Sequence, residues 1–309
     1  MQETPVSIHS ESSAAILVTP SLLRDWPLPA PGEDKYSRGA VLVIGGARTT
    51  PGAALLAGTA ALRAGAGKIT LAVAESAAVQ IGVALPECGA VGLPDNTNGS
   101  VTGEGLDRIA GDLEKADSLL IGPGLDDLDL AEALLRALLE QEQSDGGTGT
   151  EGRPAVVLDA FALGVLGRIE ENLEPWRGRL ILTPNPTETG ILLGRDVEDL
   201  ERDVAAVADR FDAVVSCQGI IAGPSGADGK LWKITTGYGG LGTSGSGDVL
   251  TGAVAGLRAR GTSDAQAACW GTHLHAAAAD RLASKLGPLG FLARELADEL
   301  PALMLELHT

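Results

Sequence analysis

The chain has few aromatic residues, few cysteines and no long apolar run. Only 3% of its 309 residues are aromatic, so Ala, Val and Leu must fill the core of a chain that is 44% hydrophobic. Its three cysteines, Cys88, Cys217 and Cys269, are widely spaced and form no Cys-x-x-Cys pair. This pattern supports neither a disulfide framework nor a zinc site. We therefore expect a protein of the reducing cytoplasm.

Positive charge is also scarce. The chain carries 23 Lys and Arg against 41 Asp and Glu, and its net charge of −18 argues against nucleic acid or an anionic membrane as a partner. No apolar run approaches the roughly 20 residues that span a bilayer. The first 13 residues lack the basic region and apolar core of a secretory signal. We expect residues 1–15 to form a disordered leader, and any phosphate site to depend on local backbone donors.

Short apolar runs alternate with Ala-rich helical segments along the chain. The runs predict strands at residues 40–44, 69–73, 118–121, 155–158, 180–182 and 213–215, several of them continuously apolar. Helices are expected between them at residues 53–64, 106–113, 129–141, 188–193 and 197–209. This pattern predicts an α/β fold in which helices cover both faces of a mostly parallel sheet, with ligands at the carboxyl ends of the strands. We expect one domain over residues 16–309, with a flexible loop near residues 143–154.

The stretch LGTSGSGDVLTG at residues 241–252 is the most informative part of the chain. Its glycines allow positive φ or close backbone approach just before an apolar helix that begins near Val249. Such a turn directs backbone N–H groups and the helix dipole at one point, which suits a phosphoryl group. Asp248 lies among these donors and is a candidate base for a hydroxyl beside the phosphate. Its other interpretation is a residue that only caps the helix.

This glycine turn is neither a Walker A sequence nor a dinucleotide-binding fingerprint, since no Gly-Lys-Ser/Thr follows it and no Gly-x-Gly-x-x-Gly opens the first βα unit. Residues 237–252 instead resemble the ribokinase-like superfamily, and within it the ADP/ATP-dependent NAD(P)H-hydrate dehydratases. Further similar stretches follow in the family's order, at residues 35–46, 51–67, 120–125, 156–160, 182–188 and 290–301. The resemblance covers roughly residues 16–305.

The resemblance implies a ribokinase-like three-layer α/β/α sandwich and a lyase that repairs a damaged cofactor. ADP or ATP, with Mg²⁺, would phosphorylate the hydroxyl of (6S)-hydrated NADH or NADPH, and elimination of phosphate would restore the reduced nicotinamide. The family also implies a homo-oligomer, with a tetramer as its form, and the Ala-rich helices suit packing between subunits.

The resemblance also implies the site residues. Asp248 would be the catalytic base and would contact the substrate, together with Ala53, Gly124 and Asn185. The nucleotide would lie against Gln218, Gly219, Ser244, Gly245, Ser246 and Gly247. Gly45, Gly46 and the segment Gly122-Pro123-Gly124 follow strands, where the backbone can approach a ligand closely.

Asn185 and Glu188 follow a predicted strand and open a helix. Both can face the crevice at the strand ends and hold Mg²⁺ through water, as the Asn-x-x-Glu motif does in ribokinase-like kinases. The alternative is a helix start that Asn185 or Thr187 caps, with Glu188 placed favourably for the helix dipole. Most hydrate dehydratases have His at the position of Asn185, so this chain departs toward the vitamin kinases.

Three other positions are interpreted from their residue types. Gln218 stands where the family usually has a Lys, which removes a charge-assisted phosphate contact, and Phe161 replaces the second acid of the family's Asp-Ala-Asp. Asp159 remains and is expected to shape the site. His273 and His275 lie two apart on an Ala-rich helix and point to different faces, which favours packing roles over a metal site.

Two other functions remain open from the sequence. An ordinary small-molecule kinase of the same fold would act on a vitamin precursor or a sugar and release a stable phosphorylated product. A catalytically weakened relative would bind a nucleotide without turnover, because of the change at Gln218.

Overall fold

The computed structural model describes residues 15–144, 152–227, 229–237 and 239–308. Residues 1–14 of the expected leader lie outside the described residues. So do residues 145–151 of the loop expected near residues 143–154.

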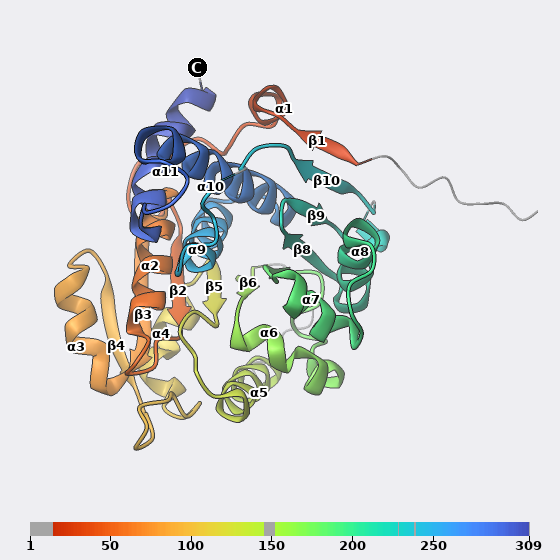
Figure 1. Ribbon diagram of the computed structural model, residues 1–309. Coiled ribbons are helices and arrows are strands. Elements are labelled where there is room, and N and C mark those ends of the chain that lie inside the picture. The colour runs from red at the N-terminus through yellow and green to blue at the C-terminus, as the bar shows by residue number, and fades with distance from the viewer. Residues whose placement is uncertain (1–14, 145–151, 228, 238, 309) are drawn as a thin grey trace, which may run out of the picture.

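Ten strands of the described chain form one sheet, in the order β1-β10-β9-β8-β7-β6-β5-β2-β3-β4 (Figure 1). They are β1 (Ile16–Val18), β2 (Ala40–Ile44), β3 (Lys68–Ala74), β4 (Gly89–Leu93), β5 (Ser118–Ile121), β6 (Ala155–Leu158), β7 (Leu180–Leu182), β8 (Ala213–Cys217), β9 (Ile220–Ala222) and β10 (Leu231–Ile234). The strands are parallel except β9, which is antiparallel to both β8 and β10.

The helices found within the described residues alternate with these strands. They are α1 (Pro20–Asp25), α2 (Pro51–Arg63), α3 (Glu75–Ala84), α4 (Ala110–Leu113), α5 (Leu128–Ser144), α6 (Phe161–Val165), α7 (Pro186–Leu193), α8 (Leu200–Phe211), α9 (Ser246–Ala259), α10 (Asp264–Leu286) and α11 (Ala293–His308). Short 3₁₀ turns lie at Leu106–Ile109, Leu166–Arg168, Glu170–Asn172 and Ser225–Ala227.

The six strands expected from apolar runs are confirmed, four of them with the expected bounds. The five predicted helical segments are found, with starts that differ from the predictions by up to three residues. The segment at residues 106–113 begins as a 3₁₀ turn, and α8 begins at Leu200 because Asp199 caps it by accepting a hydrogen bond from the Arg202 amide at 3.0 Å. Strands β1, β4, β9 and β10 were not predicted.

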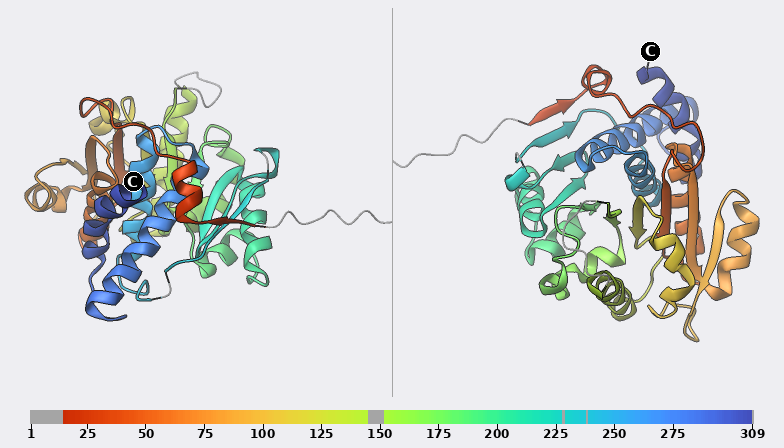
Figure 2. Two further views of the ribbon diagram at one scale, coloured as in Figure 1. Left: turned by 90° about the horizontal axis from the view of Figure 1, so that it is seen from above. Right: turned by 180° about the vertical axis from the view of Figure 1, so that it is seen from behind.

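Helices cover both faces of the sheet. Successive side chains of a strand point to opposite faces, so an apolar strand must be covered on both. On β2, Val41 and Val43 join a core with α2, α9, α10 and α11, whereas Leu42 and Ile44 join a second core with α5 to α8. The views in Figure 2 separate these two layers. The continuous apolar runs of the sequence are therefore strands buried on both faces.

Helix α9 packs unusually closely against α2 and α10. A Cβ on Gly252 or Gly256 would overlap the carbonyl oxygen of Ala57 or Ala61 on α2, and one on Gly271 of α10 would lie 2.7 Å from Val254 Cγ2. Glycine at these positions lets the helix backbones approach one another. This contact sets where the first turn of α9 lies relative to the strand ends.

Two further features bear on expectations from the sequence. Among the described residues no helix is long and apolar enough to cross a membrane. Cys88, Cys217 and Cys269 are free, and Cys217 and Cys269 are buried.

We predict that Gly252→Ala lowers the free energy of unfolding by about 1–3 kcal/mol, because the new methyl group forces α9 away from α2. Chemical denaturation of the purified protein measures this change. The control is Gly111→Ala on exposed α4, where a Cβ meets nothing within 4 Å. That change should be neutral or stabilising, by about 0.5–1 kcal/mol. Equal effects of the two substitutions would contradict the proposed close contact.

Candidate functional site

A cavity of about 660 Å³ opens at the carboxyl ends of β7 and β8. One wall is the first turn of α9 and another is the middle of α10, while the turn between β8 and β9 and the residues after β10 close the far side. The lining includes Thr183, Asn185, Ser216, Gln218, Gly219, Ile234, Thr236, Ser246, Gly247, Leu250, Thr272, His275 and Ala276. The cavity thus lies at the edge of the sheet where ligands of α/β folds bind.

The start of α9 is open to a ligand. Gly245 is the N-cap residue with a φ of 86°, and no side chain caps the helix. The Ser246 amide donates to the Thr243 carbonyl, and the Val249 amide donates to the Gly245 carbonyl. The amides of Gly247 and Asp248 belong to the first turn, where backbone N–H groups have no acceptor within the helix. These N–H groups and the helix dipole favour an anion here. The geometry of the glycine turn is therefore compatible with the anion site that the sequence predicts.

A buried carboxylate, Asp159, and a half-buried one, Asp248, lie at this helix start. Burial raises the pKa of Asp248 to about 6. Burial, followed by the charges of Glu188 and Asp248, raises the pKa of Asp159 to about 7. Asp159 Oδ2 faces Gly247, at 4.0 Å from the position of a Cβ there, while its Oδ1 accepts from Thr183 Oγ1 at 3.1 Å. A base with a pKa near neutrality is matched to proton transfer at physiological pH.

The glycines after β2 and β5 form a second part of the site. The Gly46 amide donates to the Pro123 carbonyl at 2.8 Å, and Thr50 Oγ1 donates to the Gly124 carbonyl at 2.8 Å. A Cβ on Gly124 would lie 3.1 Å from that of Ala53, so the structure brings these two predicted residues together. The neighbouring Gly122 fits closely against the Asp159 backbone. Asp159 thus joins these glycines to the start of α9.

Asn185 and Glu188 form a reciprocal cap of α7. Asn185 Oδ1 accepts from the Glu188 amide at 3.0 Å, and Glu188 Oε2 accepts from the Asn185 amide at 2.8 Å. The capping interpretation of this pair is confirmed. Burial raises the pKa of Glu188, and its charge acts on Asp159. The pair therefore caps a helix and also contributes negative charge beside Asp159.

Gln218 and Gly219 form the two-residue turn between β8 and β9. Both have positive φ, 45° and 80°, as a type I′ hairpin turn requires. This hairpin was not predicted from the sequence, because Gln is not a usual residue at the first position of a type I′ turn. Ala160, directly after Asp159, also has a positive φ of 51°. Such strained non-glycine backbone is typical of functional sites.

Both histidines are buried in α10, as the expected packing role requires, but His275 also makes a polar contact that was not predicted. Its Nε2 lies 2.9 Å from Ser246 Oγ, both side chains are buried, and both line the cavity. His273 points elsewhere, and its buried Nδ1 has no hydrogen-bond partner within the described chain. The i, i+2 spacing correctly put the two rings on different faces, but it carried no information about which helix each face meets.

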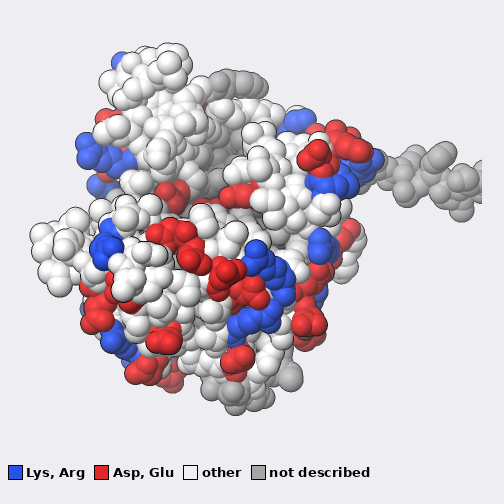
Figure 3. All heavy atoms as spheres, turned by 60° about the horizontal axis from the view of Figure 1, so that its bottom comes forward, with Lys and Arg blue, Asp and Glu red and all other residues white. Residues whose placement is uncertain are grey.

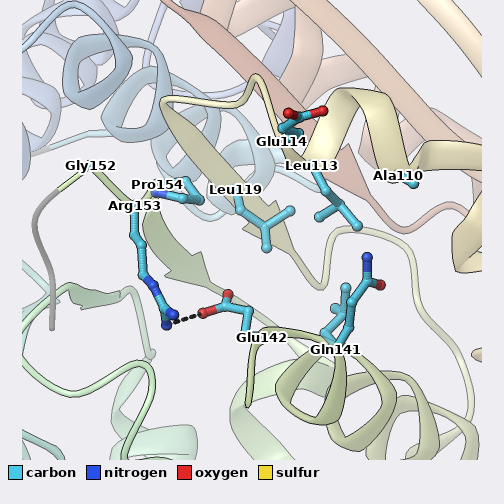
Figure 4. Close-up of a pocket in the computed structure, with 10 residues that line it drawn as sticks. Ala110, Leu113, Glu114, Leu119, Gln141, Glu142, Gly152, Arg153 and Pro154 are labelled. Carbon is cyan, nitrogen blue, oxygen red and sulfur yellow. Dashed lines mark hydrogen bonds and ion pairs between the residues drawn. The ribbon is translucent and has the colours of Figure 1, made fainter. Parts of the chain in front are cut away.

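A smaller cavity of about 220 Å³ lies at the opposite end of the sheet, before β5 and β6. Figure 4 shows the ion pair between Arg153 Nη1 and Glu142 Oε2 in its wall, at 3.2 Å. Neither the start of α9 nor the glycine turn at residues 242–247 lines it. We therefore take the 660 Å³ cavity as the candidate site.

The face at the bottom of Figure 1 is hollowed, and acidic side chains border this hollow (Figure 3).

Comparisons with known proteins identify related enzymes. A family model described as NAD(P)H-hydrate dehydratase matches residues 41–302. The chain is 40% identical over 292 residues to the ADP-dependent (S)-NAD(P)H-hydrate dehydratase of Xanthomonas campestris pv. campestris. The aligned residues cover 93% of this chain and 95% of that protein. It also matches bifunctional NAD(P)H-hydrate repair enzymes, of which it spans about half the length.

Solved structures confirm the ribokinase-like α/β/α fold. The ADP/ATP-dependent NAD(P)H-hydrate dehydratase from Bacillus subtilis, co-crystallised with ATP and Mg²⁺, has a TM-score of 0.71 and 26% identity, over 96% of this chain and 100% of that chain. A ribokinase-like superfamily protein from Enterococcus faecalis V583 has a TM-score of 0.79 and 20% identity, over 97% of this chain and 98% of that chain.

We predict that Asp159→Asn stabilises the metal-free protein at pH 8 by roughly 2–4 kcal/mol, and much less at pH 5. The folded-state pKa of about 7 exceeds the ordinary value of 3.8, so the wild type loses stability as pH rises through this window. Asparagine keeps an acceptor for Thr183 and carries no charge. Denaturation at both pH values measures the difference, with exposed Asp107→Asn as the control. A gain that does not depend on pH would contradict the assigned cause.

Proposed function

This chain belongs to the NAD(P)H-hydrate dehydratase family, and we propose that it uses ADP or ATP to convert (6S)-hydrated NADH or NADPH back to NADH or NADPH. The observation that carries the proposal is the uncapped start of α9, with the Asp248 carboxylate in its first turn and the cavity beside it. This combination places anion donors and a base at one point. Residues 16–309 would act as one catalytic unit.

The nucleotide phosphates would lie against the turn at Ser244, Gly245, Ser246 and Gly247, with Gln218 and Gly219 across the cavity. Ser246, Gly247, Gln218 and Gly219 line that cavity. Backbone amides stabilise the charge of the transferred phosphoryl group without having to reorganise during the reaction. In a protein of net charge −18, such local donors are the main source of positive potential at the site.

The hydrated nicotinamide would lie on the other side of Asp248, against Ala53, Gly124 and Asn185. Ala53 and Gly124 are adjacent and present only small groups, which leaves room for a flat ring against the backbone. The Asp248 carboxylate would take the proton of the substrate hydroxyl as its oxygen attacks the phosphoryl group. AMP or ADP is released by this transfer. Phosphate then leaves with the electron pair of the C–O bond, the neighbouring ring carbon loses a proton to solvent, and the C=C bond of the ring is restored.

The residues present fit a Mg²⁺ ion bound with the nucleotide. The negative charges of Glu188 and Asp248 act on Asp159 and help to raise its pKa, and a cation would relieve this repulsion. Within the described chain no three acidic, His or Cys side chains form a metal-ligand group, so Asn185 and Glu188 would hold the ion through water. Bound Mg²⁺ would neutralise phosphate charge.

We also propose a homo-oligomer in the reducing cytoplasm. Val79 and Val83 of α3 lie one turn apart and are 76% and 79% exposed, which suits contact with another subunit. The buried free thiols of Cys217 and Cys269 suit a reducing compartment.

The direct test incubates the protein with hydrated NADH, Mg²⁺ and either ADP or ATP, while the absorbance of the reduced nicotinamide is followed. We expect the absorbance to return together with release of phosphate. A stable phosphorylated product of a vitamin precursor or sugar would favour the kinase alternative. Nucleotide binding without turnover would favour a weakened relative.

We predict that Asp248→Asn lowers turnover by about 10²–10⁴-fold without lowering the melting temperature, because the amide keeps the shape of the side chain but cannot accept the proton. Burial raises the pKa of Asp248 to about 6, so kcat/KM of the wild type should fall as pH drops below about 6, where the base becomes protonated. Steady-state kinetics and thermal melts measure both effects. Turnover close to that of the wild type would remove Asp248 from this role.

We predict that Gln218→Lys tightens nucleotide binding by about tenfold at low salt, since it adds a charge-assisted contact to a phosphate. The gain should shrink as salt screens the new contact. Calorimetric titration at two ionic strengths measures it. The control is Gln141→Lys, which lines the smaller cavity and should change nothing. An affinity that stays the same in Gln218→Lys would mean that the phosphates lie elsewhere.

A further inference from the structure

Two pairs of buried polar side chains lie behind the candidate site, and α10 contributes one member of each. Thr272 Oγ1 lies 2.8 Å from Ser216 Oγ of β8, and His275 Nε2 lies 2.9 Å from Ser246 Oγ of α9. All four side chains line the cavity and are no more than 6% exposed. Only the pair of His275 and Ser246 reaches the anion turn itself.

A serine in the first turn of a helix has a competing use for its hydroxyl. Serine oxygens near a helix start readily accept hydrogen bonds from the free backbone N–H groups there. In this chain such a bond would occupy an amide donor of the first turn of α9. The start of α9 has no side-chain cap, and the Ser246 hydroxyl contacts His275 instead.

We propose that His275 is a positioning residue for phosphoryl binding at the start of α9. Its Nε2–H donates to Ser246 Oγ, which holds this oxygen away from the helix amides. The Ser246 O–H is then left to donate to a phosphoryl oxygen of the nucleotide. The inference rests on the proposed function, because it takes the bound anion to be a phosphate of ADP or ATP.

The protonation of the ring supports a role through hydrogen bonding. Burial lowers the pKa of His275 to about 4, so the ring is neutral near pH 7. A neutral imidazole has one N–H, and the other ring nitrogen is an acceptor. With the N–H on Nε2, the ring donates to Ser246 Oγ, and the Ser246 O–H can then donate to an anion.

The test measures binding of ADP, and separately of ATP, by calorimetry. His275→Leu should weaken nucleotide binding by about tenfold, the loss of one hydrogen bond to a charged ligand. In turnover assays KM for the nucleotide should rise while KM for the hydrated substrate stays unchanged. The matched control is His273→Leu, a buried neighbour on α10 that does not line the cavity, and it should bind both ligands as the wild type does.

Conservative variants separate positioning from packing. His275→Gln can place an amide N–H near the position of Nε2 and should recover most of the affinity, whereas the amide of His275→Asn stops short of Ser246 and should behave like His275→Leu. Ser246→Ala should cost about as much as His275→Leu, and the double variant no more than either, since the two residues act as a unit.

The possible failures point to different conclusions. If the wild type binds the nucleotide and His275→Leu binds it equally well, this inference alone is overturned. An equal loss in His273→Leu, or no difference between the Gln and Asn variants, would also overturn it, because the effect would then be one of packing. A wild type that binds neither ADP nor ATP would instead contradict the proposed function.

Discussion

The site depends on the close contact of α9 with α2 and α10. Gly252 and Gly256 bring α9 onto the backbone of α2, and Gly271 brings α10 onto α9. These contacts lie in a well-packed core, where a single added methyl group has no space. They therefore hold the first turn of α9 at a defined place beyond the strand ends. The anion donors, Asp248 and Ser246 all take their positions from this one packing arrangement.

The site also lowers the stability of the unliganded fold, through like charges and strained backbone, and a bound ligand would reduce this cost. Asp159 and Asp248 lie partly or wholly out of water with raised pKa values, and Glu188 adds a third negative charge nearby. Ala160 and Gln218 hold positive φ at the edge of the site. Strain and like charges gathered in one place are typical of sites that bind and transform ligands. Here they suit a nucleotide bound with a cation.

The two parts of the site meet at Asp159. Its backbone lies against Gly122 of the strand-end glycines, and its carboxylate faces Gly247 at the start of α9. Polar contacts from α10 then support the α9 side from behind, through His275 and Ser246. The proposed substrate side is built from backbone and small residues, whereas the proposed nucleotide side is built from a helix start and buried hydroxyls. Each side thus presents chemistry that suits its proposed ligand.

The sequence alone determined the layered fold, most of the central strands and the place of the glycine turn before a helix. Strands such as β2 and β6 are continuously apolar because both faces are buried, and this is a local pattern. Glycines before an apolar helix are equally local, so the turn at residues 242–247 could be recognised from the chain. The edge strands β1 and β4 and the hairpin of β9 and β10 could not, since they are short and lack a strong turn signal.

Only the tertiary structure decided which side chains work together. Spacing showed that His273 and His275 face different ways, but the angle at which α10 crosses α9 decided that His275 meets Ser246. Asp159 likewise reaches Gly247 across nearly ninety positions of chain. The capping interpretation of Asn185 and Glu188 was one of two that the sequence allowed, and geometry confirmed it. Local patterns report what each segment forms, whereas contacts between distant segments follow from how those segments pack.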